Sequence, residues 1–195
     1  VRGEIYETDA RTAELCKLSE NTYRDVNIAF ANELAKICEG LGIDAWNLIR
    51  LCNRHPRVNI HQPGPGVGGH CIAVDPWFIV ERNPEEARII RLARETNDSM
   101  PAYVAGKVDQ ILKGCADPAV GVLGITYKPD VDDVRESPVL ALMDLLRQRG
   151  ITLAYYDPHA RNHPGSTPNA VDAAKGKDLL IVGVNHQAFK ELDYE

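Results

Sequence analysis

The sequence predicts an α/β protein in two parts, an all-helical region over residues 1–116 and a parallel α/β domain over residues 117–195. Two observations lead to this prediction. Apolar residues recur at three- and four-residue steps as far as Gly114, which is the period of an amphipathic helix. After Asp117-Pro118, short apolar runs alternate with helical segments, a pattern typical of a doubly wound sheet.

Glycines, prolines and one capping residue divide the helical region. The expected helices span residues 12–40, 45–52, 84–100 and 102–113. Gly42 is a plausible C-terminal stop for the first helix, and Asp44 is a good N-cap for the second. Pro84 suits the first turn of the third helix, which Pro101 interrupts. The expected apolar stripe of the first helix contains Leu15, Leu18, Thr22, Val26, Ala29 and Phe30.

The second region alternates strands with helices. Strands are expected over residues 119–125, 151–156 and 178–184, with helices over residues 137–150 and 171–174. Ser137-Pro138 forms an N-cap and first-turn pair for the longer helix, and Gly150 ends it. Strands joined in this order by helices form a parallel, Rossmann-like half-domain.

Composition narrows the class of protein. The net charge of −6 argues against a nucleic-acid-binding protein, and no apolar run approaches the length of a membrane span. The five cysteines are scattered, without the spacing of a zinc site, so no metal is expected. Unpaired cysteines favour a reduced, cytoplasmic protein. The sequence starts without Met, and we expect it to be part of a longer chain.

A glycine-rich stretch over residues 63–70 runs directly into Cys71. Its glycines permit a tight loop whose backbone N–H groups come close to a ligand. The following residues read as the start of a helix, and the positive end of a helix favours a thiolate. A lone cysteine is more often a small buried side chain. The loop in front of Cys71 favours a reactive thiol, a candidate nucleophile.

Two groups of polar and positively charged side chains are candidates for anion binding. Lys17, Asn21 and Arg24 are spaced so that their side chains project from one face of the first helix. This face is either a solvated surface or a row of donors aimed at an anion. His55 lies between two arginines, including Arg57, in a loop that is either a phosphate or carboxylate site or plain surface.

In open parallel sheets, ligands bind beyond the carboxyl ends of the strands. Tyr127 and Lys128 follow the first strand, and Arg135 follows soon after, so the two cations are placed to meet phosphates. The GxGxxG fingerprint of a dinucleotide site is missing there. Asp157 ends the second strand where a ribose-binding acid would lie, but without the glycines that role is disfavoured.

Taken together, these residues resemble the nucleotide-diphosphate-sugar 6-dehydrogenase family. The resemblance rests on residues 14–21, 53–59, 64–76, 124–130 and 133–138, in the family's order. It implies an N-terminal NAD-binding domain that is absent here, a helical dimerisation domain over 1–116, and a C-terminally truncated UDP-binding domain over 117–195. It also implies a homodimer that binds a UDP-sugar.

The resemblance further implies an NAD-dependent oxidation of the sugar C6 alcohol to the uronate, through a thiohemiacetal and a thioester on Cys71. Lys17 and Asn21 would stabilise oxyanions, and Asp75 would act as a base or orient water. The implied substrate contacts are Arg24, His55, Arg57, Gly66, Gly68, Tyr127 and Lys128. Arg135 matches a residue that contacts NAD.

Three alternatives stay open. Val74 stands where the UDP-glucose branch has lysine, which with His55 and His70-Cys71 favours the UDP-N-acetyl-D-mannosamine branch over the UDP-glucose branch. A Cys/His hydrolase would use Cys71 with His70 or His55 and would act without NAD. Adjacent side chains at a helix start diverge, which disfavours His70 as the base. Taken alone, these residues could also form a non-catalytic, dimerising UDP-sugar-binding module.

Overall fold

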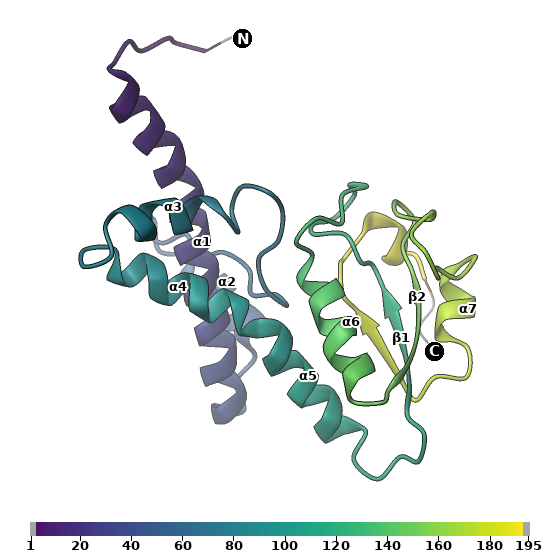
Figure 1. Cartoon of the computed structure of the whole chain (residues 1–195). Coiled ribbons are helices and arrows are strands. Elements are labelled where there is room, and N and C mark those ends of the chain that lie inside the picture. Colours follow the sequence, from purple (N-terminus) through teal and green to yellow (C-terminus); the bar gives the residue numbers. More distant parts are fainter. Residues whose placement is uncertain (1–2, 193–195) are drawn as a thin grey trace.

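The computed structural model describes residues 3–192 and shows a helical region joined to a three-stranded α/β region (Figure 1). The helical region contains α1 (Ala10–Leu41), α2 (Ala45–Cys52), α3 (Asp75–Arg82), α4 (Arg88–Asp98) and α5 (Met100–Ile111). The long α1 crosses α3 and α4, and its first turns extend beyond them (Figure 1). None of the helices described over 3–192 is long and apolar enough to cross a membrane.

Local signals explain most helix ends. Asp44 caps α2 by accepting hydrogen bonds from the backbone N–H groups of Trp46 and Asn47, at 2.9 and 3.2 Å. Gly42 ends α1 with a φ of +68°, a left-handed conformation that glycine adopts without strain. Pro101 lies in the first turn of α5 and so separates it from α4. These predictions are confirmed.

Two predictions about the helical region are wrong. The third predicted helix does not start at Pro84, because residues 84–86 form a turn after α3 and α4 begins at Arg88. The apolar stripe predicted for α1 is only partly buried, since Leu15 and Phe30 are 53% and 49% exposed. Thr22 and Ala29 of that stripe are buried, and the polar Asn21, Asp25 and Asn32 are buried beside them.

The α/β region is the parallel sheet that the sequence predicts. Its strands are β1 (Ala119–Leu123), β2 (Thr152–Tyr156) and β3 (Leu179–Val182), in the order β2-β1-β3 with both pairs parallel. Helices α6 (Pro138–Gln148) and α7 (Ala170–Ala174) form the crossovers, and a 3-10 turn, η1 (Gln187–Phe189), follows β3. Ser137 is the N-cap of α6, but its side chain makes no capping hydrogen bond.

Helix α5 links the two regions. Its Ala105 and Val108, with Leu112 directly after the helix, are buried in one cluster with α6 and the inner residues of β1. Figure 1 shows α5 running alongside α6 before the chain enters β1. The boundary predicted near residue 116 therefore separates a helix from a strand that share one core, and this packing holds the helical region against the sheet.

Candidate active site

The glycine-rich loop over residues 63–70 lies between the two regions and is held by both. The Gly64 N–H donates to Asn32 Oδ1 on α1 at 2.9 Å. The Gly69 N–H donates to the Arg135 carbonyl, in the segment before α6, at 3.1 Å. Because both anchors are specific hydrogen bonds, the loop has a defined path on each side of the junction.

Close packing explains why this loop needs glycine. A Cβ atom on Gly68 would lie 2.4 Å from the Glu136 carbonyl oxygen, and one on Gly69 would lie 2.9 Å from the Tyr127 ring. Gly69 also has a φ of +86°, which side chains with a Cβ rarely adopt. The loop is therefore seated directly on the Tyr127 and Glu136 segments of the α/β region.

Cys71 follows this loop in a turn over residues 70–74, one turn before α3 begins at Asp75. The thiol is half-buried, and the Cys71 carbonyl accepts a hydrogen bond from the Asp75 N–H at 2.8 Å. The His70 Nδ1 lies 3.5 Å from the Cys71 Sγ. The expectation that these two side chains diverge is therefore wrong, because they lie in a turn and not at a helix start.

Asn21 and Asp75 form the polar contact beside this turn. The Asn21 Nδ2 donates to Asp75 Oδ2 at 2.5 Å across the junction of α1 and α3. The Arg24 guanidinium donates to Asn21 Oδ1, so both ends of the amide are engaged. The structure thus brings together three residues that the sequence placed in two separate groups.

Three other predicted site residues are on the surface. The Lys17 ammonium is exposed and lies 3.4 Å from the Glu20 carboxylate. His55 and Arg57 are exposed in the loop after α2, where the Arg57 N–H donates to the His55 Nδ1 at 3.3 Å. Their side chains are accessible to an anion from solvent.

A cavity of about 740 Å³ opens between the glycine-rich loop and the carboxyl ends of β1 and β3. Gly64, Gly66, Tyr127 and Lys128 line it, together with Gly183. The Lys128 ammonium lies 5.5 Å from the centre of the Tyr127 ring, within cation–π range. The cavity lies at the edge of the sheet where ligands of parallel α/β domains bind.

Arg135 is exposed beside the loop that leads to Cys71. Its guanidinium is bidentate to Asp133, with Nε 3.0 Å from Oδ1 and a terminal nitrogen 2.6 Å from Oδ2. These hydrogen bonds from Arg135 lower the pKa of Asp133 to about 2. Arg135 is therefore a cation held in a fixed orientation at the surface.

Comparison with known proteins follows the same division into two parts. Residues 11–99 match the central domain of the UDP-glucose/GDP-mannose dehydrogenase family, and residues 121–195 match its UDP-binding domain. The chain belongs to this family. It is 50% identical to an NDP-N-acetyl-D-galactosaminuronic acid dehydrogenase of Ralstonia solanacearum, over 99% of the chain and 47% of that protein.

Other relatives extend the likeness. The chain is 50% identical to a UDP-N-acetyl-D-mannosamine dehydrogenase of Methanocaldococcus jannaschii, over 100% of the chain and 45% of the relative. The solved UDP-N-acetyl-mannosamine dehydrogenase Cap5O from S. aureus superposes with a TM-score of 0.90 at 52% identity, covering 99% of the chain and 46% of that structure. The dehydrogenase-family chain thus spans about half the length of the curated relatives it matches.

The sequence analysis missed a buried polar group behind the glycine-rich loop of this dehydrogenase-family chain. Asp25 on α1 accepts hydrogen bonds from Arg94 at 2.5 Å and Asn97 at 2.8 Å, and Asn97 also accepts from Asn32 at 2.9 Å. Burial raises the pKa of Asp25, although the charge of Arg94 opposes this shift. Since Asn32 also holds Gly64, the network links α1 and α4 to the loop.

The sequence contains a signal for this network, but the same signal fits either a solvated or a buried polar face. Asp25 and Asn32 lie four and eleven residues after Asn21, so all three share one face of α1. A polar stripe is usually solvated, and only the packing of α4 shows that this one is buried.

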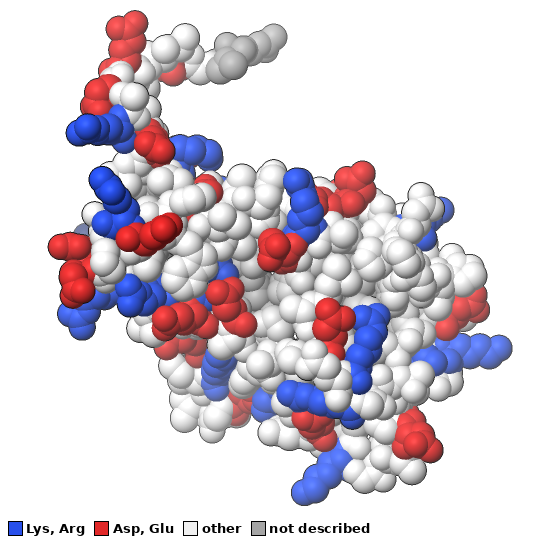
Figure 2. Space-filling model, viewed as in Figure 1, with Lys and Arg blue, Asp and Glu red and all other residues white. Residues whose placement is uncertain are grey.

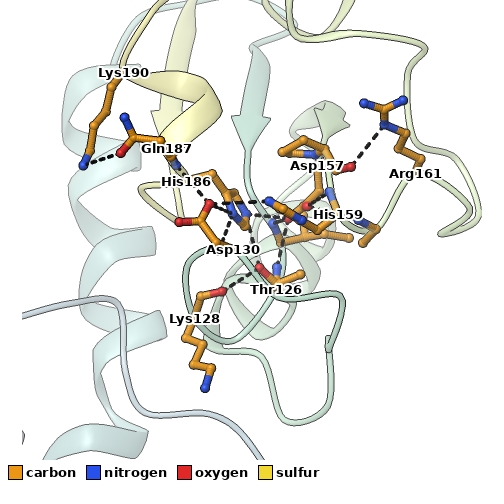
Figure 3. Close-up of polar contacts among 12 residues, drawn as sticks. Thr126, Lys128, Asp130, Asp157, His159, Arg161, His186, Gln187 and Lys190 are labelled. Carbon is orange, nitrogen blue, oxygen red and sulfur yellow. Dashed lines mark hydrogen bonds and ion pairs between the residues drawn. The ribbon is translucent and has the colours of Figure 1, made fainter.

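In this dehydrogenase-family fold, the chain's own backbone engages the Asp157 carboxylate. Its carboxylate is fully buried and accepts backbone hydrogen bonds from Ile125, Thr126, His159 and Ala160 at 2.7 to 3.2 Å. Figure 3 shows it inside a polar cluster with His186 and Thr126. This burial agrees with the sequence, which disfavours a ribose-binding role for Asp157.

Proposed function

We propose that these residues form part of an NAD-dependent UDP-sugar 6-dehydrogenase that oxidises UDP-N-acetyl-D-mannosamine to the uronate through Cys71. The observation that carries this proposal is the position of Cys71 at the end of the glycine-rich loop, one turn from the Asn21–Asp75 contact. The relatives' names support the substrate class, because two at 50% identity are dehydrogenases of N-acetylated nucleotide sugars.

Each of the proposed site residues has a role in the oxidation. The Cys71 thiolate adds to the C6 aldehyde to give a thiohemiacetal, and after the second oxidation water releases the acid from the thioester. Asn21, and Lys17 after release from its exposed contact with Glu20, stabilise the oxyanion at C6. Asp75 accepts the proton or orients the water. Bound NAD supplies the hydride acceptor for each oxidation.

The residues proposed for the nucleotide fit its chemistry. Lys128 offers an exposed cation and Tyr127 an aromatic face in the cavity of about 740 Å³, and Gly66 and Gly68 belong to the loop beside it. Arg24, His55 and Arg57 are the proposed contacts to the rest of the substrate. Arg135, already held by Asp133 next to the loop, suits a phosphate group of NAD.

We propose a homodimer formed through α1. Tyr23, Phe30 and Ile37 follow one another at seven-residue steps on α1, and each is about half exposed. A seven-residue apolar repeat is the pattern by which two helices pack side by side. A monomer rarely exposes such a continuous apolar stripe. The five unpaired cysteines are consistent with a cytoplasmic location.

The test is the stoichiometry of oxidation. The whole protein is incubated with NAD and, separately, UDP-N-acetyl-D-mannosamine, UDP-N-acetyl-D-galactosamine and UDP-glucose, and NADH per sugar consumed is counted. Two NADH with one sugar are expected. Cys71→Ala should abolish turnover, whereas Cys115→Ala, at an exposed thiol between α5 and β1, should not. One NADH per sugar would remove Cys71 from the mechanism.

The contact between His70 and Cys71 favours a second candidate, a thiol hydrolase. Such an enzyme would cleave its substrate without NAD, and His70→Ala would abolish activity together with Cys71→Ala. If no sugar is oxidised and UDP still binds, the residues act as a nucleotide-binding module instead. The same incubation with NAD omitted separates these outcomes.

A further inference from the structure

The segment over residues 126–130 carries Tyr127 and Lys128 into the cavity and is anchored at its first residues by one carboxylate. Asp157 Oδ2, at the end of β2, accepts hydrogen bonds from the Ile125 N–H at 2.7 Å and the Thr126 N–H at 3.2 Å. Burial opposes the ionisation of Asp157, yet the backbone donors and His186 lower its pKa, so it is a charged acceptor at neutral pH.

The other end of the segment is held from the turn after β3. The Asp130 N–H donates to the Nδ1 atom of the fully buried His186 at 2.9 Å. In return, Asp130 Oδ1 accepts from the Gln187 N–H at 3.0 Å. Asp130 has a φ of +58°, so the chain turns sharply at this point and the two hydrogen bonds hold the turn.

His186 connects the two anchors. Because its Nδ1 accepts a hydrogen bond, a neutral ring carries its proton on Nε2, which lies 3.0 Å from Asp157 Oδ2 and 3.2 Å from Thr126 Oγ1. Thr126 Oγ1 in turn donates to the Lys128 carbonyl at 3.0 Å. Figure 3 shows this continuous chain of contacts from Asp157 to Asp130 and Lys128.

The same residues do not make a metal site. Ligand atoms of Asp130, His159 and His186 lie within 4.8 Å of one another. Both ring nitrogens of His186 are already hydrogen-bonded, one as an acceptor and one as a donor. A metal ion would have to displace the Asp130 N–H or Asp157, and so would undo the structure of the segment.

We propose that His186, together with Asp157, is a positioning residue that holds the 126–130 segment in the form that binds the nucleotide. This proposal rests on the proposed function, which assigns Tyr127 and Lys128 to the UDP side. This clamp, formed by the contacts of His186 and Asp157, holds the backbone at both ends of the segment, and neither of these two residues lines the cavity. Loss of the clamp leaves the binding residues present but not held in place.

The test compares UDP affinity with local order. UDP binding to the whole protein is measured by calorimetry for wild type, His186→Gln and His163→Gln. His163 is the matched control, a half-buried histidine of the same domain whose Nδ1 lies 2.8 Å from the Tyr155 hydroxyl. If the segment is ordered only a tenth of the time, His186→Gln weakens UDP binding about tenfold. His163→Gln should leave it unchanged.

Two variants at the exposed Asp130 distinguish loss of these contacts from unfolding of the domain. Asp130 is exposed, so Asp130→Ala removes the acceptor for the Gln187 N–H without disturbing a core. Asp130→Asn keeps an acceptor and suits the positive φ, so it should restore UDP affinity. Hydrogen exchange of the amides at 125, 126 and 130 should accelerate in His186→Gln and Asp130→Ala alone.

Three results would decide against the inference. UDP affinity unchanged in both His186→Gln and Asp130→Ala, with faster exchange of these amides, would show that binding does not need the clamp. Equal loss of affinity in His163→Gln would show a general loss of stability. No UDP binding by wild type would instead overturn the proposed function on which the inference rests.

Discussion

Gly68→Ala tests whether the seating of the glycine-rich loop controls catalysis. A Cβ at Gly68 would lie 2.4 Å from the Glu136 carbonyl oxygen and 2.9 Å from both Pro138 Cδ and Tyr127 Cβ. Real Cβ atoms essentially never approach closer than 3.0 Å, so the loop must move away from Glu136 by at least about 0.6 Å. The opposing atoms are mostly backbone or ring atoms, which cannot turn aside.

Cys71 is three residues further along, so most of this displacement reaches the thiol. A misplacement of about 1 Å can cost a factor of about 100 in rate, and we expect Gly68→Ala to lower kcat by about 10- to 100-fold. The Gly69 bond to Arg135 is lost or lengthened by the same shift. The folded state should persist, because Gly68 lies in a loop outside both hydrophobic clusters of the described chain.

The assay is steady-state NADH formation with the sugar that wild type oxidises, together with thermal unfolding. Gly40→Ala is the matched control, since a Cβ there meets no atom within 4 Å, the position has no positive φ, and this exposed residue near the end of α1 does not line the cavity. It should keep wild-type kcat within about twofold, as expected for an unstrained surface change. Wild-type kcat in Gly68→Ala, with an unchanged melting temperature, would refute the reasoning.

Three further predictions concern other parts of the chain. Asn32→Ala leaves the Gly64 N–H and the Asn97 amide without their partner, so urea denaturation should show a loss of about 1–3 kcal/mol; exposed Asn47→Ala should cost far less. Phe30→Glu places a charge in the proposed α1 interface and should convert the dimer to monomer in light scattering, whereas Glu33→Gln should not. The pKa of Asp157 is lower in the folded chain than the usual value of about 3.9, so its stabilisation is present above about pH 4 and is lost as the pH falls further; Asp157→Asn should flatten this loss in urea titrations at successive pH values, and an equally steep loss in the variant would contradict the assignment.

The sequence alone determined those features that depend on local backbone chemistry. Asp44 and Gly42 specify helix ends through a side-chain acceptor and a left-handed φ, and both need only neighbouring residues. The alternation of apolar runs and helices after Asp117 likewise specified a parallel sheet, because such runs are buried only when helices cover both faces. The resemblance to the family added the expected roles of the site residues.

Predictions from local patterns were wrong where a residue has more than one possible structural role. The start of α4 was misplaced because Pro84 suits a turn as well as a first helical turn. The buried face of α1 was misjudged because Asp25 and Asn32 are buried only by virtue of partners on α4, which lies more than 60 residues away in the chain. Pairing of this kind is invisible to hydrophobic periodicity.

Only the tertiary structure determined which of the separate motifs contact one another. It placed the Asn21 amide on Asp75, seated Gly68 on the Glu136 carbonyl, and joined Asp157 to Asp130 through His186. Each contact links segments that the sequence separates by 29 residues or more, and each depends on ångström-scale packing of whole elements. The residue types could therefore be predicted from sequence, whereas their geometry required the fold.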